Sequence, residues 1–344
     1  MKIAIHRREK SFSNRWIAYC KKNDIDFILV DAYANNIIEQ LEGCDGFLWH
    51  HKHSISMDIL FAKQLLYSLE AKGVTVFPNF NTTWHFDDKL GQKYLFEAIN
   101  APFVPTYVFY SKDIALNWVK KTSFPKVFKL RGGSGSSNVK LISTESEAIK
   151  YVNKAFGKGF RQYQALSSLK ERWRKYKNGL TNLYDVFKGV MRFYIEPEYS
   201  KTIGFERGYI YFQDFVPNNN HDIRVIVIGK RAFALKRMVR EGDFKASGSG
   251  YMKFDREEFD ERCIKIAFET NNKLNAQCLA YDFVFDEKNT PLIVEISFGF
   301  SVDAYDSCPG YWDENLIWYE KKFIPQNWMV EDLLSEIQLK RAVI

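Results

Sequence analysis

Short apolar runs alternate with stretches of helical spacing over the first part of the chain. The runs and the stretches between them are, in order, Lys2–His6, Asn14–Asn23, Phe27–Asp31, Asn35–Glu42, Gly46–His50, Ser54–Lys72 and Val74–Pro78. Alternating strand and helix patterns predict a small parallel sheet with helices packed on it. We therefore expect an open α/β lobe here, with ligands beyond the carboxyl ends of its strands.

The rest of the chain is predicted to contain hairpins separated by helices. Strand patterns lie at Thr106–Tyr110, Phe124–Ile142, Gly208–Asp214, Asp222–Gly229, Arg231–Val239, Ala276–Asp286 and Leu292–Ser297. Helical patterns lie at 87–100, Ile114–Lys121, Thr144–Lys154, Asp255–Asn271, Gly310–Tyr319 and Val330–Lys340.

The hairpin at Phe124–Ile142 carries a loop of glycine and serine residues between its strands. Glycine lets successive backbone N–H groups turn toward one point, which suits phosphate oxygens. The loop lacks the Lys-Ser/Thr pair and the following helix of P-loop proteins. A mobile turn without a ligand is therefore an open alternative.

Composition limits the class of protein. The 344 residues are 46% hydrophobic and 26% charged, as expected for a globular protein large enough for two or three lobes around a cleft. The net charge of +7 favours anionic ligands without establishing nucleic-acid binding. The five scattered cysteines, the absence of a signal peptide and the lack of an eighteen-residue apolar run predict a cytoplasmic protein with reduced thiols and no membrane partner.

Two acids interrupt apolar strands near the end of the chain. Asp282 follows Tyr281, Glu295 follows Val294, and strand alternation allows both carboxylates to face the same side. A buried carboxylate needs a cation, and oxygen ligands on rigid strands suit Mg²⁺. The alternative is a pair of acids bonded to Arg224, Arg237 or Lys236.

The segment Trp49–His53 follows the third predicted strand. His50 and His53 could bind a metal ion, could form a cationic or hydrogen-bonding wall of a substrate cleft, or could have no role. We prefer the wall to the metal, because no acid or cysteine lies nearby in the sequence.

A basic stretch with aromatic residues lies at Lys170–Lys177. Such a stretch can bind phosphates or nucleic acid. We favour a solvated helical insertion at about 156–207.

Six motifs in the same order resemble the ATP-grasp superfamily, and in particular its RimK-like ligases. They are Asp88-Lys89 with Pro105-Thr106, Pro125–Lys129 with the glycine-serine loop, Gln213–Val216, Asp222–Val225, Arg240–Ser247, and Tyr281–Phe283 with Val294–Ser297. Where the family has Asn, this chain has Ser297, which leaves the number of metal ions open. Phe298–Ser301 replaces the usual Ser-Pro-Gly turn, so the acceptor side differs.

The resemblance implies a fold class and a domain order. The fold would be α/β, of the α+β ATP-grasp type, with a small N-terminal open α/β lobe at 1–86. Two ATP-grasp subdomains would follow, the small one at 87–212 with its basic insertion and the large one at 213–344. They would clamp ATP between them.

The resemblance also implies residue roles. The cofactor-binding residues would be Lys89, Lys129, Gly133, Ser134 and Gly135 for phosphates, Gln213, Asp214, Phe215 and Val216 for adenine, and Asp222 for ribose. The magnesium ligands would be Asp282, Glu295 and Ser297. The catalytic residues would be Arg237, which would stabilise the transferred phosphoryl group, and Arg224 and Lys245, which would bind an anionic substrate.

The activity implied is that of an ATP-dependent ligase. It would join a small-molecule carboxylate to an amine through an acyl phosphate, with ATP and Mg²⁺ as cofactors. A small-molecule kinase and a non-catalytic nucleotide- or nucleic-acid-binding module are the alternatives. Nucleic acid is not the expected partner, and the oligomeric state is open, with a homodimer as one alternative.

Overall fold

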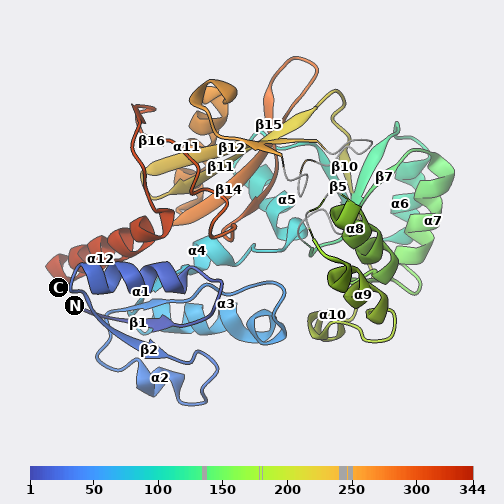
Figure 1. Ribbon diagram of the computed structural model, residues 1–344. Coiled ribbons are helices and arrows are strands. Elements are labelled where there is room, and N and C mark those ends of the chain that lie inside the picture. Colours follow the sequence, from blue (N-terminus) through green and yellow to red (C-terminus); the bar gives the residue numbers. More distant parts are fainter. Residues whose placement is uncertain (134–137, 178, 180, 240–245, 247–250, 344) are drawn as a thin grey trace.

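Three large β-sheets organise the described chain (Figure 1). The structure is a computed structural model that describes residues 1–133, 138–177, 179, 181–239, 246 and 251–343. A fourth sheet of two short strands adjoins a helical insertion. The architecture is mixed α/β, as predicted.

The first sheet is parallel and has the order β2-β1-β3-β4. Its strands are β1 (Lys2–His6), β2 (Asp26–Val30), β3 (Gly46–Leu48) and β4 (Thr75–Phe77), and its helices are α1 (Ser13–Lys22), α2 (Ile37–Gln40), α3 (Ser56–Ala71) and α4 (Phe80–Thr83). Alternation along β1 sends Ile3 and Ile5 to the core beneath α1 and Ala4 to the core beneath α3. The predicted open α/β arrangement is therefore confirmed.

The second sheet is antiparallel and has the order β5-β10-β6-β7. Its strands are β5 (Thr106–Phe109), β6 (Lys126–Lys129), β7 (Val139–Ile142) and β10 (Ile210–Asp214), with helices α6 (Lys112–Val119) and α7 (Glu145–Ala155). The helices bury Val119 and Val152 against Phe128 and Phe212 of the sheet. The predicted hairpin at Phe124–Ile142 forms β6 and β7, which pair from Lys126 opposite Ile142 to Lys129 opposite Val139.

The third sheet has the order β15-β14-β11-β12-β16-β17, with β13 beside β12. Its strands are β11 (His221–Ile228), β12 (Arg231–Met238), β13 (Met252–Lys253), β14 (Cys278–Phe285), β15 (Pro291–Ser297), β16 (Tyr311–Asp313) and β17 (Trp318–Tyr319). One face packs on α11 (Glu261–Leu274) and α5 (Lys89–Ala98), and the other on α12 (Pro325–Val343). Side chains along β11 alternate between the two cores, with Val225 in one and Ile226 in the other.

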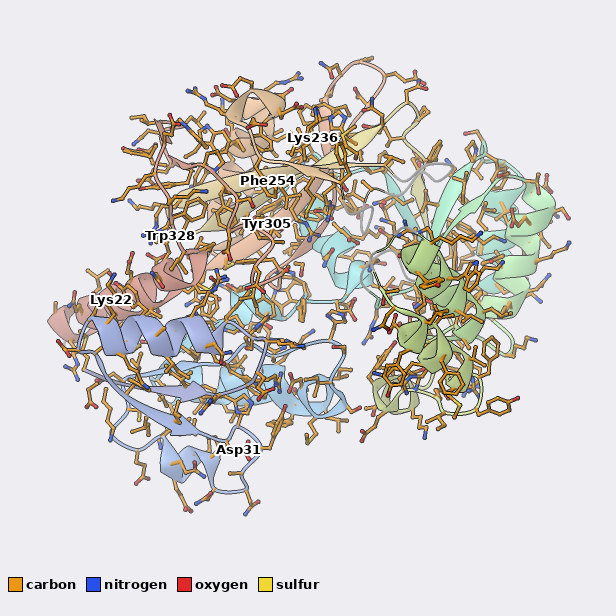
Figure 2. The ribbon with its side chains drawn as sticks, in the orientation of Figure 1. Lys22, Asp31, Lys236, Phe254, Tyr305 and Trp328 are labelled. Atoms are coloured by element: carbon orange, nitrogen blue, oxygen red, sulfur yellow. The ribbon has the colours of Figure 1, made fainter. Side chains whose placement is uncertain are left out.

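Helix α12, at the C-terminal end of the described chain, packs against the N-terminal lobe. Trp328, Leu333 and Ile337 of α12 share one core with Ile5 of β1 and Trp16 of α1. Figure 2 labels Trp328 and Tyr305, which both belong to this core. The last helix is therefore packed against the first lobe as well as against the third sheet.

The insertion consists of three helices, α8 (Ala165–Lys177), α9 (Leu183–Met191) and α10 (Glu198–Ile203). Two short paired strands, β8 (Phe160–Arg161) and β9 (Phe205–Glu206), close its base. In Figure 1 the three helices stand below the second sheet, away from α12. The boundaries 1–86, 87–212 and 213–344 stay predictions.

The helix predicted at Gly310–Tyr319 is wrong, because this segment forms the hairpin of β16 and β17. Tyr311 stacks on Tyr319 with ring centroids 5.3 Å apart, and Trp312 lies beside Trp318. Aromatic residues favour strands, where cross-strand rings meet. This local preference outweighed the helical spacing.

All five cysteines are free and buried, which agrees with the prediction of unpaired thiols. No helix among the described residues is long and apolar enough to cross a bilayer.

Candidate active site

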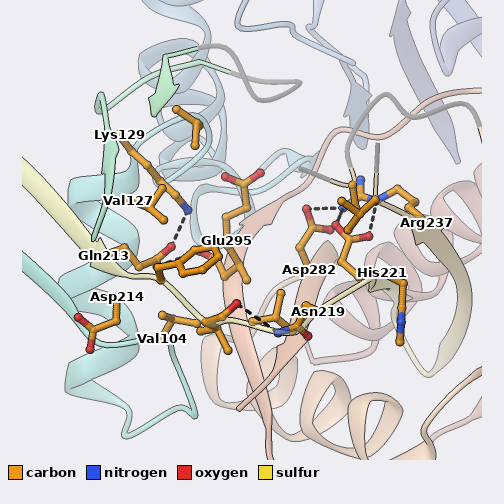
Figure 3. Close-up of a pocket in the computed structure, with 18 of the residues that line it drawn as sticks. Val104, Val127, Lys129, Gln213, Asp214, Asn219, His221, Arg237, Asp282 and Glu295 are labelled. Carbon is orange, nitrogen blue, oxygen red and sulfur yellow. Dashed lines mark hydrogen bonds and ion pairs between the residues drawn. The ribbon is translucent and has the colours of Figure 1, made fainter. Parts of the chain in front are cut away.

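A cavity lies where the second and third sheets face each other (Figure 3). Strands β6 and β10 contribute one wall, which includes Lys129 and Gln213. Strands β11, β12, β14 and β15 contribute the other wall, which carries Asp282 and Glu295. We call this space the nucleotide cavity, after the ligand that the sequence motifs predict.

One part of the nucleotide cavity is apolar. It is lined by Val104, Val127, Val139, Val284 and Val294. Phe215 and Val216, in the connection after β10, also line it. Branched aliphatic walls with few polar groups suit a flat, weakly polar ring such as a purine.

Lys129 is a buried lysine at the end of β6. Its side chain is held by Gln213, whose Oε1 accepts a hydrogen bond of 2.6 Å from Nζ. Gln213 in turn donates to Thr106 Oγ1 at 3.1 Å, so the acceptor is fixed in place. Burial lowers the pKa of Lys129 to about 8, against the opposing effect of Glu295.

Lys89 stands at the start of α5, which begins there because Asp88 caps the helix by accepting from the Gly91 N–H. Lys89 Nζ donates to the Gly133 carbonyl at 2.8 Å and lies 3.7 Å from Glu295 Oε2. The Gly133 N–H donates to Asp87 at 2.7 Å. The start of the glycine-serine loop is thus tied to the start of α5.

Asp282 is paired with two arginines. Arg224 donates to both carboxylate oxygens, at 2.5 and 2.8 Å, and Arg237 Nη2 lies 2.9 Å from Oδ2. Burial acts to raise the pKa of Asp282, but the two guanidinium groups outweigh it and hold the pKa well below its usual range. Arg237 also makes a two-pronged pair with Asp222 at 2.7 and 2.6 Å. Of the two interpretations of this acid from the sequence, a magnesium ligand or a partner of arginine, the structure shows Asp282 bonded to arginine.

Glu295 lies directly opposite Asp282 in the register of β14 and β15. Its side chain is 33% exposed, so it faces the cavity. Ser297 Oγ donates to the Gly299 carbonyl at 2.9 Å, which leaves the hydroxyl oxygen as an acceptor.

These oxygens fit magnesium only together with a phosphate. Among the described residues no group of three or more His, Cys, Asp or Glu could hold a metal ion alone. Mg²⁺ commonly binds one or two carboxylates and completes its shell with water and substrate phosphate oxygens. Glu295 and Asp282, with Ser297 near them, supply such a partial set.

A second cavity of about 1000 Å³ adjoins the first, and we call it the substrate cavity. Gly133 and Glu295 line both cavities. The loops after β1 and β3 contribute Ser11, Lys52 and other residues, so the space lies beyond the carboxyl ends of the first sheet, as predicted. Arg224 and Lys89 also line it.

His50 forms part of the substrate cavity as a neutral side chain. Its Nδ1 accepts from the Phe12 N–H at 3.1 Å, so the ring proton resides on Nε2. Its ring stacks on Phe12 at 3.7 Å between centroids. Burial lowers the pKa of His50 well below its usual value. Of the alternatives for Trp49–His53, this favours a hydrogen-bonding wall over a cationic one.

The structure thus brings most of the predicted residues to one place. The predicted residues that line one or both cavities are Lys89, Lys129, Gly133, Gln213, Asp214, Phe215, Val216, Asp222, Arg224, Arg237, Asp282, Glu295 and Ser297. Ser134, Gly135 and Lys245 lie outside the described residues.

Some lining residues were missed by the sequence interpretation. Ser11 and Lys52 come from loops of the first lobe, and only the general rule for parallel sheets pointed to them.

The comparisons with known proteins agree with this geometry. Residues 197–306 match the family model of the RimK-like ATP-grasp domain. No curated protein sequence matches the chain. The structure of D-alanine–D-alanine ligase from Bacillus anthracis, complexed with ATP, is similar over 99% of both chains, with a TM-score of 0.58 and 13% identity.

Two further structures are similar. A RimK domain ATP-grasp protein from Sphaerobacter thermophilus matches 97% of this chain and 100% of its own, with a TM-score of 0.52 and 13% identity. The biotin carboxylase domain of Hydrogenobacter thermophilus 2-oxoglutarate carboxylase, in complex with MgADP and bicarbonate, matches 97% of this chain and 69% of its own. Its TM-score is 0.57 at 13% identity.

The chain therefore has the ATP-grasp fold, which confirms the resemblance seen in its motifs. Within that fold class, residues 197–306 are similar to the RimK-like ATP-grasp domain. Identities of 13% show the fold alone and leave the activity and the substrates open.

Proposed function

We propose that the protein is an ATP-dependent ligase that joins a substrate carboxylate to an amine. A carboxylate oxygen attacks the γ-phosphorus of ATP, and ADP leaves, which gives an acyl phosphate. The amine nitrogen then attacks the acyl carbon and loses a proton, and inorganic phosphate leaves. The observation that carries the proposal is that the nucleotide and substrate cavities share Gly133 and Glu295.

The nucleotide would lie along the wall formed by β6 and β10. Its base would occupy the valine-lined end beside Gln213, Asp214, Phe215 and Val216. Its phosphates would approach Lys129 and Lys89, whose compact ammonium groups suit charge-dense oxygens. Gly133, with Ser134 and Gly135, would cover them.

Asp222 is the candidate for the ribose hydroxyls. Arg237 compensates its charge while leaving lone pairs on the carboxylate oxygens.

Magnesium would be held by Glu295 and Asp282, with Ser297 as a neutral ligand or through water. When bound, the ion would supply Lewis-acid stabilisation to the phosphate oxygens. Among the residues themselves, Arg224 and Arg237 neutralise the charge of Asp282 by direct contact.

Arg237 is the candidate for stabilising the transferred phosphoryl group. It is 7% exposed and lines the nucleotide cavity, where burial strengthens its electrostatic effect. Arg224 lines the substrate cavity and is the candidate for the anionic substrate, together with Lys245.

The proposal is tested by trapping the intermediate. Purified protein is incubated with ATP, Mg²⁺, hydroxylamine and pools of amino acids, sugar acids and nucleotide sugars. An acyl phosphate reacts with hydroxylamine to give a hydroxamate, and we expect one that depends on ATP. A phosphorylated hydroxyl product without hydroxamate would show a kinase and overturn the proposal.

A further inference from the structure

The helical insertion exposes an apolar surface, which we call the insertion face. Each of its members has an exposed fraction between 40% and 85%, and they are Leu183, Tyr184, Phe187, Val190, Met191, Phe193, Tyr194 and Ile195. Soluble proteins rarely expose large apolar residues in so continuous a patch unless something binds there.

The insertion face follows from how α9 packs. Asn182 caps the helix by accepting from the Asp185 N–H, and Val186 and Gly189 turn inward against α8. A Cβ on Gly189 would lie 2.8 Å from Arg172 Cδ, so the two helices approach closely. The side of α9 that faces away from α8 is apolar, whereas the outer side of a surface helix is usually polar.

Positive charge is concentrated in the same insertion. Residues 156–207 contain eleven Lys and Arg against five Asp and Glu, a net charge of +6, while the whole chain carries +7. The rest of the chain is therefore close to neutral. Three arginines are paired within the insertion, Arg161 with Glu196, Arg172 with Asp185 and Arg174 with Glu171.

Lysines stand beside the exposed rings. Lys188 Nζ lies 4.5 Å from the centroid of the Tyr184 ring, and Lys177 lies 5.9 Å from that of Trp173. Lys188 thus borders the insertion face on α9, and Lys177 lies on the neighbouring helix α8. An apolar face edged by lysines and rich in aromatic rings is typical of helices that lie in the surface of a bilayer.

We propose that the insertion face binds the surface of an anionic lipid bilayer. Its aliphatic and aromatic side chains would enter the boundary between headgroups and acyl chains. Its lysines would approach the lipid phosphates, each contributing electrostatic attraction. The protein would lie on the surface and not cross it, since no helix among its described residues is long and apolar enough to cross.

Other occupants fit the face less well. A second copy of the chain would bring two insertions of charge +6 together, which like-charge repulsion opposes. A polynucleotide would use the rings and lysines but not the aliphatic Leu183, Val190 and Ile195. This inference departs from the expectation of no membrane partner, which rested on the lack of a long apolar run.

The test is co-sedimentation with vesicles. One set contains phosphatidylcholine alone and the other contains phosphatidylglycerol as well. The test variant is Tyr184→Ser/Phe187→Ser/Tyr194→Ser, whose side chains are 64%, 60% and 85% exposed. The matched control is Leu60→Ser/Tyr110→Ser/Leu339→Ser, with exposed fractions of 62%, 58% and 69% outside the insertion. Circular dichroism verifies that both remain folded.

We expect wild-type protein and the control variant to sediment with phosphatidylglycerol vesicles at low salt and to be released at high salt. The test variant should bind about tenfold more weakly or worse. No sedimentation of wild-type protein, or equal sedimentation of the test variant, would overturn the proposal. The proposal would also be overturned if the test variant bound vesicles as wild-type protein does but, unlike the control variant, had lost dimerisation or polynucleotide binding.

Discussion

Lys129 is the residue at which burial most directly sets the chemistry of the site. It is 4% exposed, and its ammonium group is held by the amide oxygen of Gln213. Because burial lowers its pKa to about 8, this lysine loses its charge near the alkaline end of the physiological range. A phosphate beside it would favour the charged form.

Nucleotide affinity should therefore fall as the pH rises above about 8. The charged lysine binds phosphate and the neutral lysine does not, so the decline approaches about tenfold per pH unit. Isothermal titration calorimetry with ADP between pH 7 and pH 10 measures it. Lys129→Arg keeps its charge over this range and should flatten the profile. An unchanged slope in that variant would show that another group titrates.

Asp282 and Glu295 are opposite each other but should affect stability very differently. Asp282→Ala leaves Arg224 and Arg237 buried without their shared partner, which should cost about 3–5 kcal/mol. Glu295→Gln keeps the shape of a side chain that is 33% exposed, and should cost about 1 kcal/mol or less. Urea unfolding measures both. Equal losses would contradict the assignment of Asp282 to a buried ion cluster.

Several site residues could be predicted from single positions. An acid between aromatic residues, such as Asp282, is buried with them and needs a cation wherever the strand lies. The local sequence was therefore sufficient to predict that Asp282 has a cationic partner. The choice of cation was not predictable, because Arg224 and Arg237 reach Asp282 only through the pairing of β11 with β14 and β12. His50 was also ambiguous, since its neutral state depends on the Phe12 N–H from another loop.

Elements were predicted best where they are buried. The run Lys2–His6 has the same bounds as β1, because both faces of this strand meet a core. The exposed side of α9 could not be anticipated, since its apolar spacing equals that of a helix packed on a core. The hairpin of β16 and β17 was missed because its strands are only three and two residues long.

Helix α12 should stabilise the first lobe and the third sheet together. Leu333→Ala removes a side chain that is 1% exposed in their shared core, and should cost about 2–5 kcal/mol. Leu339→Ala, at a position 69% exposed on the same helix, should cost about 0.5 kcal/mol or less. Thermal unfolding should stay a single transition in both variants. A separate early transition in Leu333→Ala would show that the helix stabilises one unit only.

At the scale of the whole molecule, the nucleotide cavity is built by two separate sheets. A ligand that contacts both walls should stabilise the folded chain, by about 2.7 kcal/mol at a concentration one hundred times its Kd. Differential scanning fluorimetry with MgATP should show a rise in Tm, and Lys129→Ala should reduce it. An equal rise in that variant would place the nucleotide elsewhere.

The most direct test of the account is ADP release by wild-type protein and by Glu295→Gln, measured with ATP, Mg²⁺ and the acid and amine pools. We expect repeated turnover by wild-type protein to require both a carboxylate and an amine, and to yield ADP, inorganic phosphate and amide in equal amounts. Glu295→Gln should abolish release while the protein remains folded. Full turnover by Glu295→Gln would contradict the assignment of this cavity as the site of catalysis.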